Sequence, residues 1–339
     1  MRTVIAIPPL HTMTGGIAVF YQIAERLREC GFAVALAGSM ASPGLMERRE
    51  AGFAVLVGEG GRISGLGPDD VYLIPEGWPN LMAPALAAKS RVLVYAQNWA
   101  YLFSALPENV SWDKLPVRFL AVSDPVDRFM RDRCALPALG IVRPAIDAAL
   151  FRPLPEQDTL PGETVRIAWM PRKNKALAEQ IRQITAVSPL CKGIPVEWVE
   201  IRNMSPDQVA QTLAQCHIFL ASGFPEGCPL PPLEAMASGC LVVGFSGFGG
   251  WDYMRQADPG TYLPRIGLRS VSWSGNGLFA ADGDVPEAAY LLAHAVHRVH
   301  TGAAQYRDTR CQGLATAAAY SPDAQRESVR AVWSALKPS

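Results

Sequence analysis

The sequence lacks the features that would place it among secreted, zinc-stabilised or membrane-spanning proteins. Its seven cysteines are scattered and include no C-x-x-C pair, which argues against a disulfide framework or a structural zinc site and favours a reducing compartment. No apolar run approaches the ~20 residues that span a bilayer. The segment MRTVIAIPPL is interrupted early by Pro8 and Pro9, so we do not expect it to be a signal peptide. We expect a cytoplasmic protein and leave open peripheral contact with the inner face of a membrane.

An excess of charge of one sign is also missing. Lys and Arg together number 31, as do Asp and Glu, so no net charge draws the whole chain to nucleic acid, and we expect no nucleic-acid partner. The sequence contains no G-x-G-x-x-G fingerprint, P-loop lysine, H-E-x-x-H or G-x-S-x-G motif. These absences leave no signature of a dinucleotide enzyme, a P-loop NTPase, a zinc protease or a serine hydrolase.

Buried strands alternating with helices dominate what is present. The chain has 339 residues, 49% of them hydrophobic, which suffices for roughly two domains at ~150 residues each. Short apolar runs separated by helical segments predict an α/β protein with parallel sheets and helices on both faces. The expected strands are Thr3–Ile7, Ala33–Ala37, Phe53–Val57, Val71–Ile74, Val92–Tyr95, Val117–Val122, Val165–Met170, Val196–Val199, Ile218–Ala221 and Cys240–Phe245.

The stretch from Ile218 to Phe245 carries the clearest functional signal. Its two apolar ends predict strands, and between them lie a Pro/Gly-rich loop and a short helix beginning near Pro231 and Pro232. We place Glu226 in the loop and Glu234 in the first turn of the helix. A helix N-terminus attracts anions such as a diphosphate, and carboxylates accept hydrogen bonds from sugar hydroxyls. Taken alone, either glutamate would be read as a solvated or capping residue.

The run EGCPLPPLEAMASGCLVV, with its E-x7-E spacing, resembles the donor site of the retaining GT-B glycosyltransferases of family 4. This resemblance implies a GT-B fold of two facing Rossmann-like domains with parallel sheets and a cleft between them. IVRPAIDAALFRP resembles the end of the family's first domain. We therefore place an acceptor domain at 1–153, a donor domain at 163–320, and a helix that returns to the first domain at 321–339.

The resemblance also implies roles for individual residues. Glu226 holds the sugar hydroxyls and stabilises positive charge, Glu234 holds the ribose, and Arg172 and Lys173 bind the diphosphate. The alternative for the two cations is a solvated basic turn. The resemblance also assigns donor contacts to the glycine pair after the first strand, Gly15 and Gly16. It assigns phosphate contacts to backbone amides of the donor loop, at Gly227, Cys228 and Leu230. The family's histidine near the sugar is replaced here by an amide side chain, that of Gln97 or Asn98.

The implied activity is transfer of a sugar from a nucleotide diphosphate donor to a hydroxyl of a saccharide, glycan or lipid-linked acceptor, with retention of configuration. The resemblance implies no cofactor and no metal. Two alternatives stay open. One is a sugar-nucleotide epimerase or a phosphorylase on the same architecture, and the other is a non-catalytic sugar-nucleotide-binding protein.

Two further patterns have simpler explanations. Asp282 and Asp284 form a D-x-D pair that could bind a divalent cation, but Asp284 is well placed to cap the following helix. Three histidines spaced three apart could form a zinc face, but they lack neighbouring ligands. They are His294, His297 and His300. We expect neither pattern to bind a metal.

Overall fold

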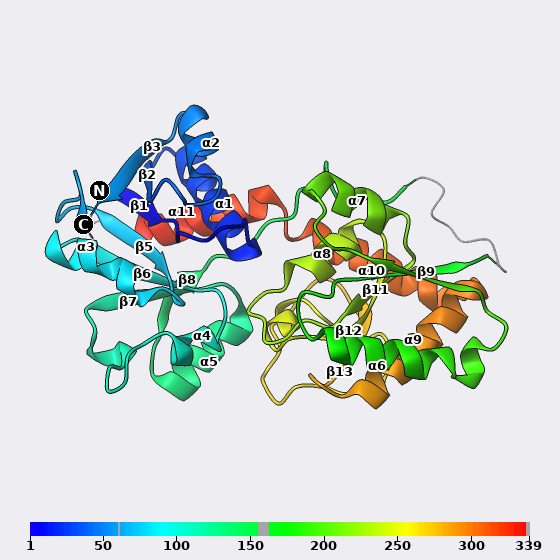
Figure 1. The fold of residues 1–339 in the computed structure, drawn as a ribbon. Helices are drawn as coiled ribbons and strands as arrows, with labels where there is room; N and C mark the ends of the chain where they lie inside the picture. Colours follow the sequence, from blue (N-terminus) through cyan, green and yellow to red (C-terminus); the bar gives the residue numbers. More distant parts are fainter. Residues whose placement is uncertain (60–61, 155–162, 337–339) are drawn as a thin grey trace. The chain divides into compact units, whose positions relative to one another are not determined.

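The chain forms two compact units in a computed structural model that describes residues 1–59, 62–154 and 163–336 (Figure 1). Unit 1 comprises Met1–Ala145 and Pro322–Ser339, and unit 2 comprises Ile146–Ser321. The chain thus passes from unit 1 to unit 2 before residue 153, where the sequence predicted the end of the first domain. Ile146 already belongs to unit 2, where its N–H donates to the carbonyl of Tyr320 at 2.7 Å. Most of the predicted linker, 155–162, and the last three residues of the 321–339 segment lie outside the described residues.

Unit 1 contains an eight-stranded sheet in the order β4-β3-β2-β1-β5-β6-β7-β8. Every pair is parallel except β3 with β4. Side chains on the central strands are almost entirely buried because helices cover the sheet. The strands are β1 (Arg2–Ala6), β2 (Ala33–Gly38), β3 (Ala54–Glu59), β4 (Arg62–Ile63), β5 (Val71–Pro75), β6 (Arg91–Ala96), β7 (Val117–Ala121) and β8 (Ala138–Ile141).

The last helix, α11 (Pro322–Leu336), belongs to unit 1, where it lies beside α1 (Figure 1). Trp333 donates its indole N–H to the hydroxyl of Thr3 at 2.7 Å, and Gln325 donates to Gln22 at 3.0 Å. These contacts attach the C-terminal helix to the first strand and the first helix. The other helices of the unit are α1 (Gly15–Glu29), α2 (Leu45–Glu50), η1 (Pro79–Met82), α3 (Ala83–Ala87), α4 (Tyr101–Ser104), η2 (Trp112–Lys114) and α5 (Asp124–Cys134).

Unit 2 contains a fully parallel five-stranded sheet in the order β10-β9-β11-β12-β13. Its strands and the helices that cover them share one apolar core. The strands are β9 (Val165–Trp169), β10 (Val196–Glu200), β11 (Ile218–Ala221), β12 (Leu241–Phe245) and β13 (Gly277–Ala280). The helices are α6 (Lys175–Ala186), η3 (Pro189–Cys191), α7 (Pro206–Ala214), α8 (Leu230–Ala237), η4 (Gly249–Asp252), α9 (Val285–His300) and α10 (Ala304–Ala318).

The prediction of an α/β protein with two parallel sheets is confirmed. All ten expected strands are present within one or two residues at each end. The sequence did not predict β4, β8, β13, α2, α4 or α10, because these elements are short or lack a clear apolar face. Within the described residues, no helix is both long enough and apolar enough to cross a bilayer.

Candidate active site

A cavity lies at the carboxyl end of the sheet in unit 2. The chain runs from β9 outward to β10 and then returns past β9 to β11, so the segments that follow β9 and β11 diverge at this point. Open α/β sheets bind their ligands at such reversals. Including its open mouth, the cavity holds about 460 Å³ of empty space. Its lining comes from Met170, Arg172, Lys173, Phe219, Leu220, Ala221, Ser222, Gly223, Glu226, Pro229, Pro231, Pro232 and Phe245.

Glu226 and Lys173 form an ion pair at the cavity wall. The Nζ of Lys173 donates to Oε1 of Glu226 at 2.7 Å and to the carbonyl of Pro225 at 3.1 Å. The two side chains are 22% and 26% exposed, so the pair is partly shielded from water. Arg172 is exposed and also lines the cavity, and within the described residues it has no acidic partner. The structure thus brings together the three residues that the sequence assigned to catalysis.

The backbone of Glu226 is fixed by the glycine turn that follows β12. The N–H of Glu226 donates to the carbonyl of Gly247 at 2.8 Å, and the N–H of Gly249 donates to the carbonyl of Glu226 at 3.0 Å. Gly247 has a φ of 65°, and a Cβ there would lie 2.7 Å from the Cβ of Glu226. Asp282 holds the same turn by accepting the N–H of Gly247 at 2.9 Å. Both the backbone conformation and the packing therefore require glycine at 247.

Asn174 joins the two loops of the cavity, and sequence analysis did not identify it. Its backbone is left-handed, with φ of 54°, and its side-chain amide donates to the carbonyls of Ser222 at 3.0 Å and Phe224 at 3.1 Å. The hydroxyl of Ser222 returns a hydrogen bond to the carbonyl of Lys173 at 3.4 Å. Asparagine is one of the few non-glycine residues that adopt a left-handed backbone readily. An asparagine directly before a helix was therefore the sequence signal that could have identified this position.

Glu234 lies in the second turn of α8, and not in the first as predicted. The helix begins at Leu230, so Glu234 is one full turn further along, and it does not line the cavity. Its side chain is partly buried, and this burial raises the pKa of the carboxyl to about 7. Within the described residues, no hydrogen bond or ion pair opposes this effect. The group therefore titrates near neutral pH.

The start of α8 offers fewer amide donors than a typical helix N-terminus. Pro229 is the N-cap residue, and Pro231 and Pro232 occupy the second and third helical positions. Of the first four helical residues, only Leu230 and Leu233 have an N–H group. Gly227 and Cys228, also predicted to bind phosphate, are buried and do not line the cavity. Binding of an anion at the start of α8 would therefore depend more on cationic side chains, and less on backbone amides, than the sequence predicted.

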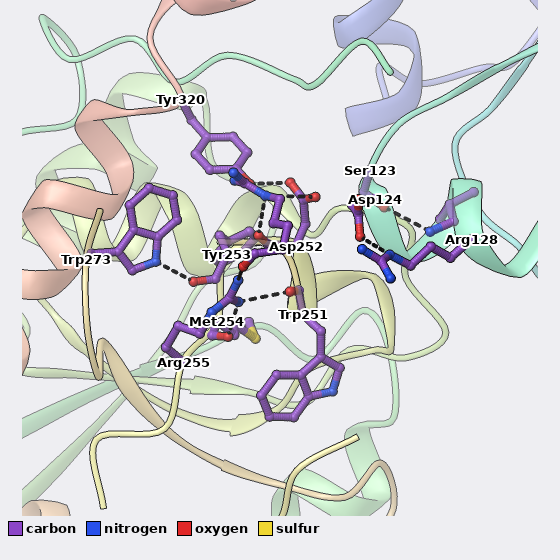
Figure 2. Close-up of polar contacts among 12 residues, drawn as sticks. Ser123, Asp124, Arg128, Trp251, Asp252, Tyr253, Met254, Arg255, Trp273 and Tyr320 are labelled. Atoms are coloured by element: carbon purple, nitrogen blue, oxygen red, sulfur yellow. Dashed lines mark hydrogen bonds and ion pairs between the residues drawn. The ribbon is translucent and has the colours of Figure 1, made fainter. Parts of the chain in front are cut away.

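A buried polar network supports Pro229 from behind. Tyr253 donates its hydroxyl to the carbonyl of Pro229 at 2.7 Å. The indole of Trp273 donates to the carbonyl of Tyr253 at 2.8 Å (Figure 2). The neighbouring Asp252 is fully buried and accepts the hydroxyl of Tyr320. Arg269 donates to the carbonyl of Asp252 at 2.9 Å. Asp252 is thus part of the scaffold behind the α8 N-cap.

The predicted residues of unit 1 also lie together at a strand end. Gln97 donates its side-chain N–H to the carbonyl of Gly16 at 2.9 Å. A Cβ at Gly16 would lie only 2.8 Å from Oε1 of Gln97, so glycine permits this close approach. Gly15 is exposed at the first position of α1. The roles of these three residues toward a donor stay predictions.

Residues of the D-x-D pair and of the histidine face contact other parts of the protein. Asp284 caps α9 by accepting the N–H of Glu287 at 3.1 Å, as predicted, while Asp282 binds the turn at Gly247. His294 packs against the ring of Tyr290, with centroids 4.4 Å apart. Across residues 1–59, 62–154 and 163–336, no three His, Cys, Asp or Glu side chains form a group that could hold a metal ion.

Comparisons with known proteins agree with this architecture. No family model matches the sequence. The chain is 27% identical over 195 residues to an alpha-1,6-glucosyltransferase of Actinobacillus pleuropneumoniae serotype 7 (strain AP76), a match that covers 53% of each protein. The chain therefore spans about half the length of this relative.

Solved structures resemble the whole chain in fold at low sequence identity. A lipopolysaccharide outer core galactosyltransferase has a TM-score of 0.65 at 11% identity, with 99% of this chain and all of that one covered. The catalytic domain of starch synthase IV from Arabidopsis thaliana, bound to ADP and acarbose, has a TM-score of 0.56 at 10% identity, with 97% and 99% covered. The architecture of this chain is therefore that of the GT-B glycosyltransferases.

Proposed function

We propose that the protein is a glycosyltransferase that moves a sugar from a nucleotide diphosphate donor to a hydroxyl acceptor. The observation that carries this proposal is the cavity of unit 2, where Arg172, Lys173 and Glu226 meet at the carboxyl ends of β9 and β11. The glucosyltransferase relative and the ADP-bound starch synthase support the same assignment. Both the cation pair and the carboxylate suit a donor that carries a diphosphate and a sugar.

Arg172 and Lys173 are proposed to bind the diphosphate without a metal. Arg172 is exposed at the cavity and presents a planar fork that matches phosphate oxygens. Lys173 is held by Glu226 before donor binds, which keeps its ammonium at the cavity wall. As the glycosidic bond breaks, negative charge grows on the leaving diphosphate, so fixed cations lower the barrier more than mobile ones would.

Glu226 is proposed to stabilise the sugar as it departs. The developing oxocarbenium carries positive charge, and a carboxylate at the cavity wall favours it. The glycine turn and Lys173 hold Glu226 from its backbone and its side chain. Because this geometry exists before substrate binds, little reorganisation is needed during the reaction.

Glu234 is proposed to accept hydrogen bonds from the ribose hydroxyls of the nucleotide. Its carboxyl has no hydrogen-bond or ion-pair partner among the described residues, and burial raises its pKa to about 7. Hydroxyl donors favour the ionised form of a carboxyl. Nucleotide binding should therefore lower the pKa of Glu234 and release a proton near neutral pH.

Retention of configuration and the acceptor class are also part of the proposal. Retention rests on the E-x7-E resemblance, and the acceptor is a hydroxyl of a saccharide, glycan or lipid-linked sugar. Incubation with a panel of nucleotide sugars and acceptors, followed by mass spectrometry and by NMR of the new anomeric proton, tests both. A product whose anomeric configuration matches that of the donor sugar supports retention, while a product with the opposite configuration overturns it.

A non-catalytic sugar-nucleotide-binding protein is the second candidate. The prolines at the start of α8 favour it, because they reduce the number of amides available to a leaving diphosphate. Such a protein would bind a nucleotide sugar but release no nucleoside diphosphate in the presence of any acceptor. An epimerase would instead yield free donor with an inverted sugar carbon.

A further inference from the structure

Two backbone segments of unit 2 lie against each other beside the cavity. Loop 226–229 begins at Glu226 and leads directly into α8, and segment 247–253 follows β12. A Cβ at Gly249 would lie only 2.1 Å from the carbonyl oxygen of Gly227. Glycine is therefore required at 249, because any other residue would push the loop away from the segment behind it.

Hydrogen bonds fix the loop to this segment at both of its ends. At the first end, the carbonyl of Gly247 accepts the N–H of Glu226, and the N–H of Gly249 donates to the carbonyl of Glu226. At the last end, the hydroxyl of Tyr253 donates to the carbonyl of Pro229 at 2.7 Å. Burial raises the pKa of Tyr253 well above its ordinary value, so the hydroxyl keeps its proton and donates at neutral pH. The loop is thus held where it begins and where it ends.

Tyr253 is itself held by buried groups. The indole of Trp273 donates to its carbonyl at 2.8 Å (Figure 2). The amide of Asn276 donates to the same carbonyl, also at 2.8 Å. The ring of Tyr320 packs edge to face against the ring of Tyr253, with centroids 5.5 Å apart, and its hydroxyl donates to the neighbouring Asp252. All five residues are buried, so the Tyr253 hydroxyl reaches the loop from a fixed position.

The start of α8 depends on this contact because its own residues supply few. Pro229 has no side-chain oxygen to cap the helix, and Pro231 and Pro232 have no N–H group. The same three prolines line the cavity, and Glu234 lies further along the helix. A small displacement of the helix start would therefore move the cavity wall and Glu234 relative to Lys173.

We propose that Tyr253 is a positioning residue of the donor cavity, whose hydroxyl sets the place of the α8 start and so the affinity for the nucleoside diphosphate. The two ends of segment 247–253 then have different effects. The glycine end fixes Glu226 and acts on the rate of sugar transfer, while the Tyr253 end fixes α8 and acts on donor binding. The inference rests on the proposed function, because it takes this cavity as the donor site. Tyr253 is fully buried and acts through Pro229 without touching the donor.

Tyr253→Phe tests the role, because it removes the hydroxyl and keeps the ring. Isothermal titration of the full chain with ADP, GDP and UDP identifies the nucleotide that the unaltered protein binds most tightly. Tyr253→Phe should raise the Kd for that nucleotide by about tenfold.

Tyr21→Phe is the matched control for this titration. Tyr21 is a buried residue of unit 1, and its hydroxyl donates to the carbonyl of Pro43 at 2.7 Å. Both variants lose one hydrogen bond between a tyrosine hydroxyl and a proline carbonyl, so their melting temperatures should fall by similar amounts. Only Tyr253→Phe should bind the nucleotide more weakly. Equal Kd values for the two variants would overturn the proposal.

Steady-state kinetics with the preferred donor separate positioning from a general loss of structure. Tyr253→Phe should raise the donor KM about tenfold and change kcat by less than about threefold, since Gly247 and Lys173 still hold Glu226. Gly247→Ala should show the opposite pattern, with the larger effect on kcat. A fall in kcat at unchanged KM in Tyr253→Phe would contradict the positioning role.

Failure of the proposed function would look different from failure of this inference. If the unaltered protein binds none of the three nucleotides, the cavity is not a donor site, and neither claim stands. If the unaltered protein and Tyr253→Phe bind the nucleotide equally well, the donor site stands and only the positioning role falls. Faster hydrogen exchange at the start of α8 with an unchanged Kd would likewise reduce Tyr253 to a stabilising contact and overturn its role in binding.

Discussion

At the scale of single residues, the most consequential contact is the one between Glu226 and Lys173. The two residues are 53 positions apart, and their 2.7 Å ion pair exists only because β9 and β11 are neighbours in the sheet. The sequence indicated each residue separately through the E-x7-E run and the basic segment after β9. It gave no sign that the two side chains pair, because that depends on how the strands are ordered.

Glu226→Gln should lower the rate of sugar transfer about a hundredfold or more, because the amide cannot stabilise positive charge on the departing sugar. The melting temperature should change little, since the residue is partly exposed and its backbone bonds are kept. Steady-state kinetics with the preferred donor check this. A variant that keeps full activity would remove Glu226 from the reaction.

Glu234→Gln should stabilise the protein at high pH. Burial raises the pKa of Glu234 from an ordinary 4.5 to about 7, so the unaltered protein loses stability as pH rises from about 4.5 through 7. The variant lacks this loss and should be more stable at pH 8 by ~3 kcal/mol, with little difference below pH 4.5. Urea denaturation at pH 8, 6.5 and 4.5 measures it, with the exposed Glu108→Gln as control. A pH-independent difference would contradict the account.

At the scale of elements, the β11–α8–β12 unit was predicted well because its signals are local. Apolar runs bounded by Gly and Pro define the strands, and β11 has the predicted ends. The start of α8 was misplaced by one residue because prolines suit several early helical positions, and this moved Glu234 out of the first turn. Asn174 and Tyr253 were missed, since the groups that give them a role lie about 20 to 50 residues away in sequence.

The glycine turn after β12 should be sensitive to a single methyl group. Gly247→Ala places a Cβ 2.7 Å from the Cβ of Glu226 in a left-handed backbone, so it should move Glu226 and lower transfer by about a hundredfold. Gly260→Ala is the matched control: its φ is 84°, and no atom lies within 4 Å of the added Cβ. Both variants pay backbone strain of about 1 kcal/mol, but only the first should lose activity. Equal activities would show that the turn does not position Glu226.

At the scale of the whole molecule, each unit is built on a sheet whose strands are parallel apart from the β3–β4 pair of unit 1. Each sheet has a reversal in strand order, and each reversal has a buried or shielded carboxyl beside it. These are Glu226 in unit 2 and Glu76 in unit 1. The alternation of strands and helices in the sequence was enough to predict the two sheets. The return of α11 to unit 1 was indicated by family resemblance alone, since the contact of Trp333 with Thr3 spans 330 residues.

A ligand bound at the unit 2 cavity should stabilise unit 2 against unfolding. At a concentration of about one hundred times its Kd, a nucleoside diphosphate should add roughly 3 kcal/mol to the free energy of unfolding of the unit that binds it. Arg172→Ala should reduce this gain, while Arg330→Ala on the exposed face of α11 should not. A thermal-shift series across nucleoside diphosphates measures both effects. Equal shifts in the two variants would exclude Arg172 from the phosphate site.

The central claim is that the cavity between the segments after β9 and β11 holds an activated sugar donor. A crystal structure with the preferred nucleoside diphosphate tests it most directly. The account predicts density for the diphosphate in this cavity, in contact with Arg172, and for the ribose within hydrogen-bond distance of Glu234. Density for the nucleotide elsewhere on the chain, with this cavity unchanged, would contradict it.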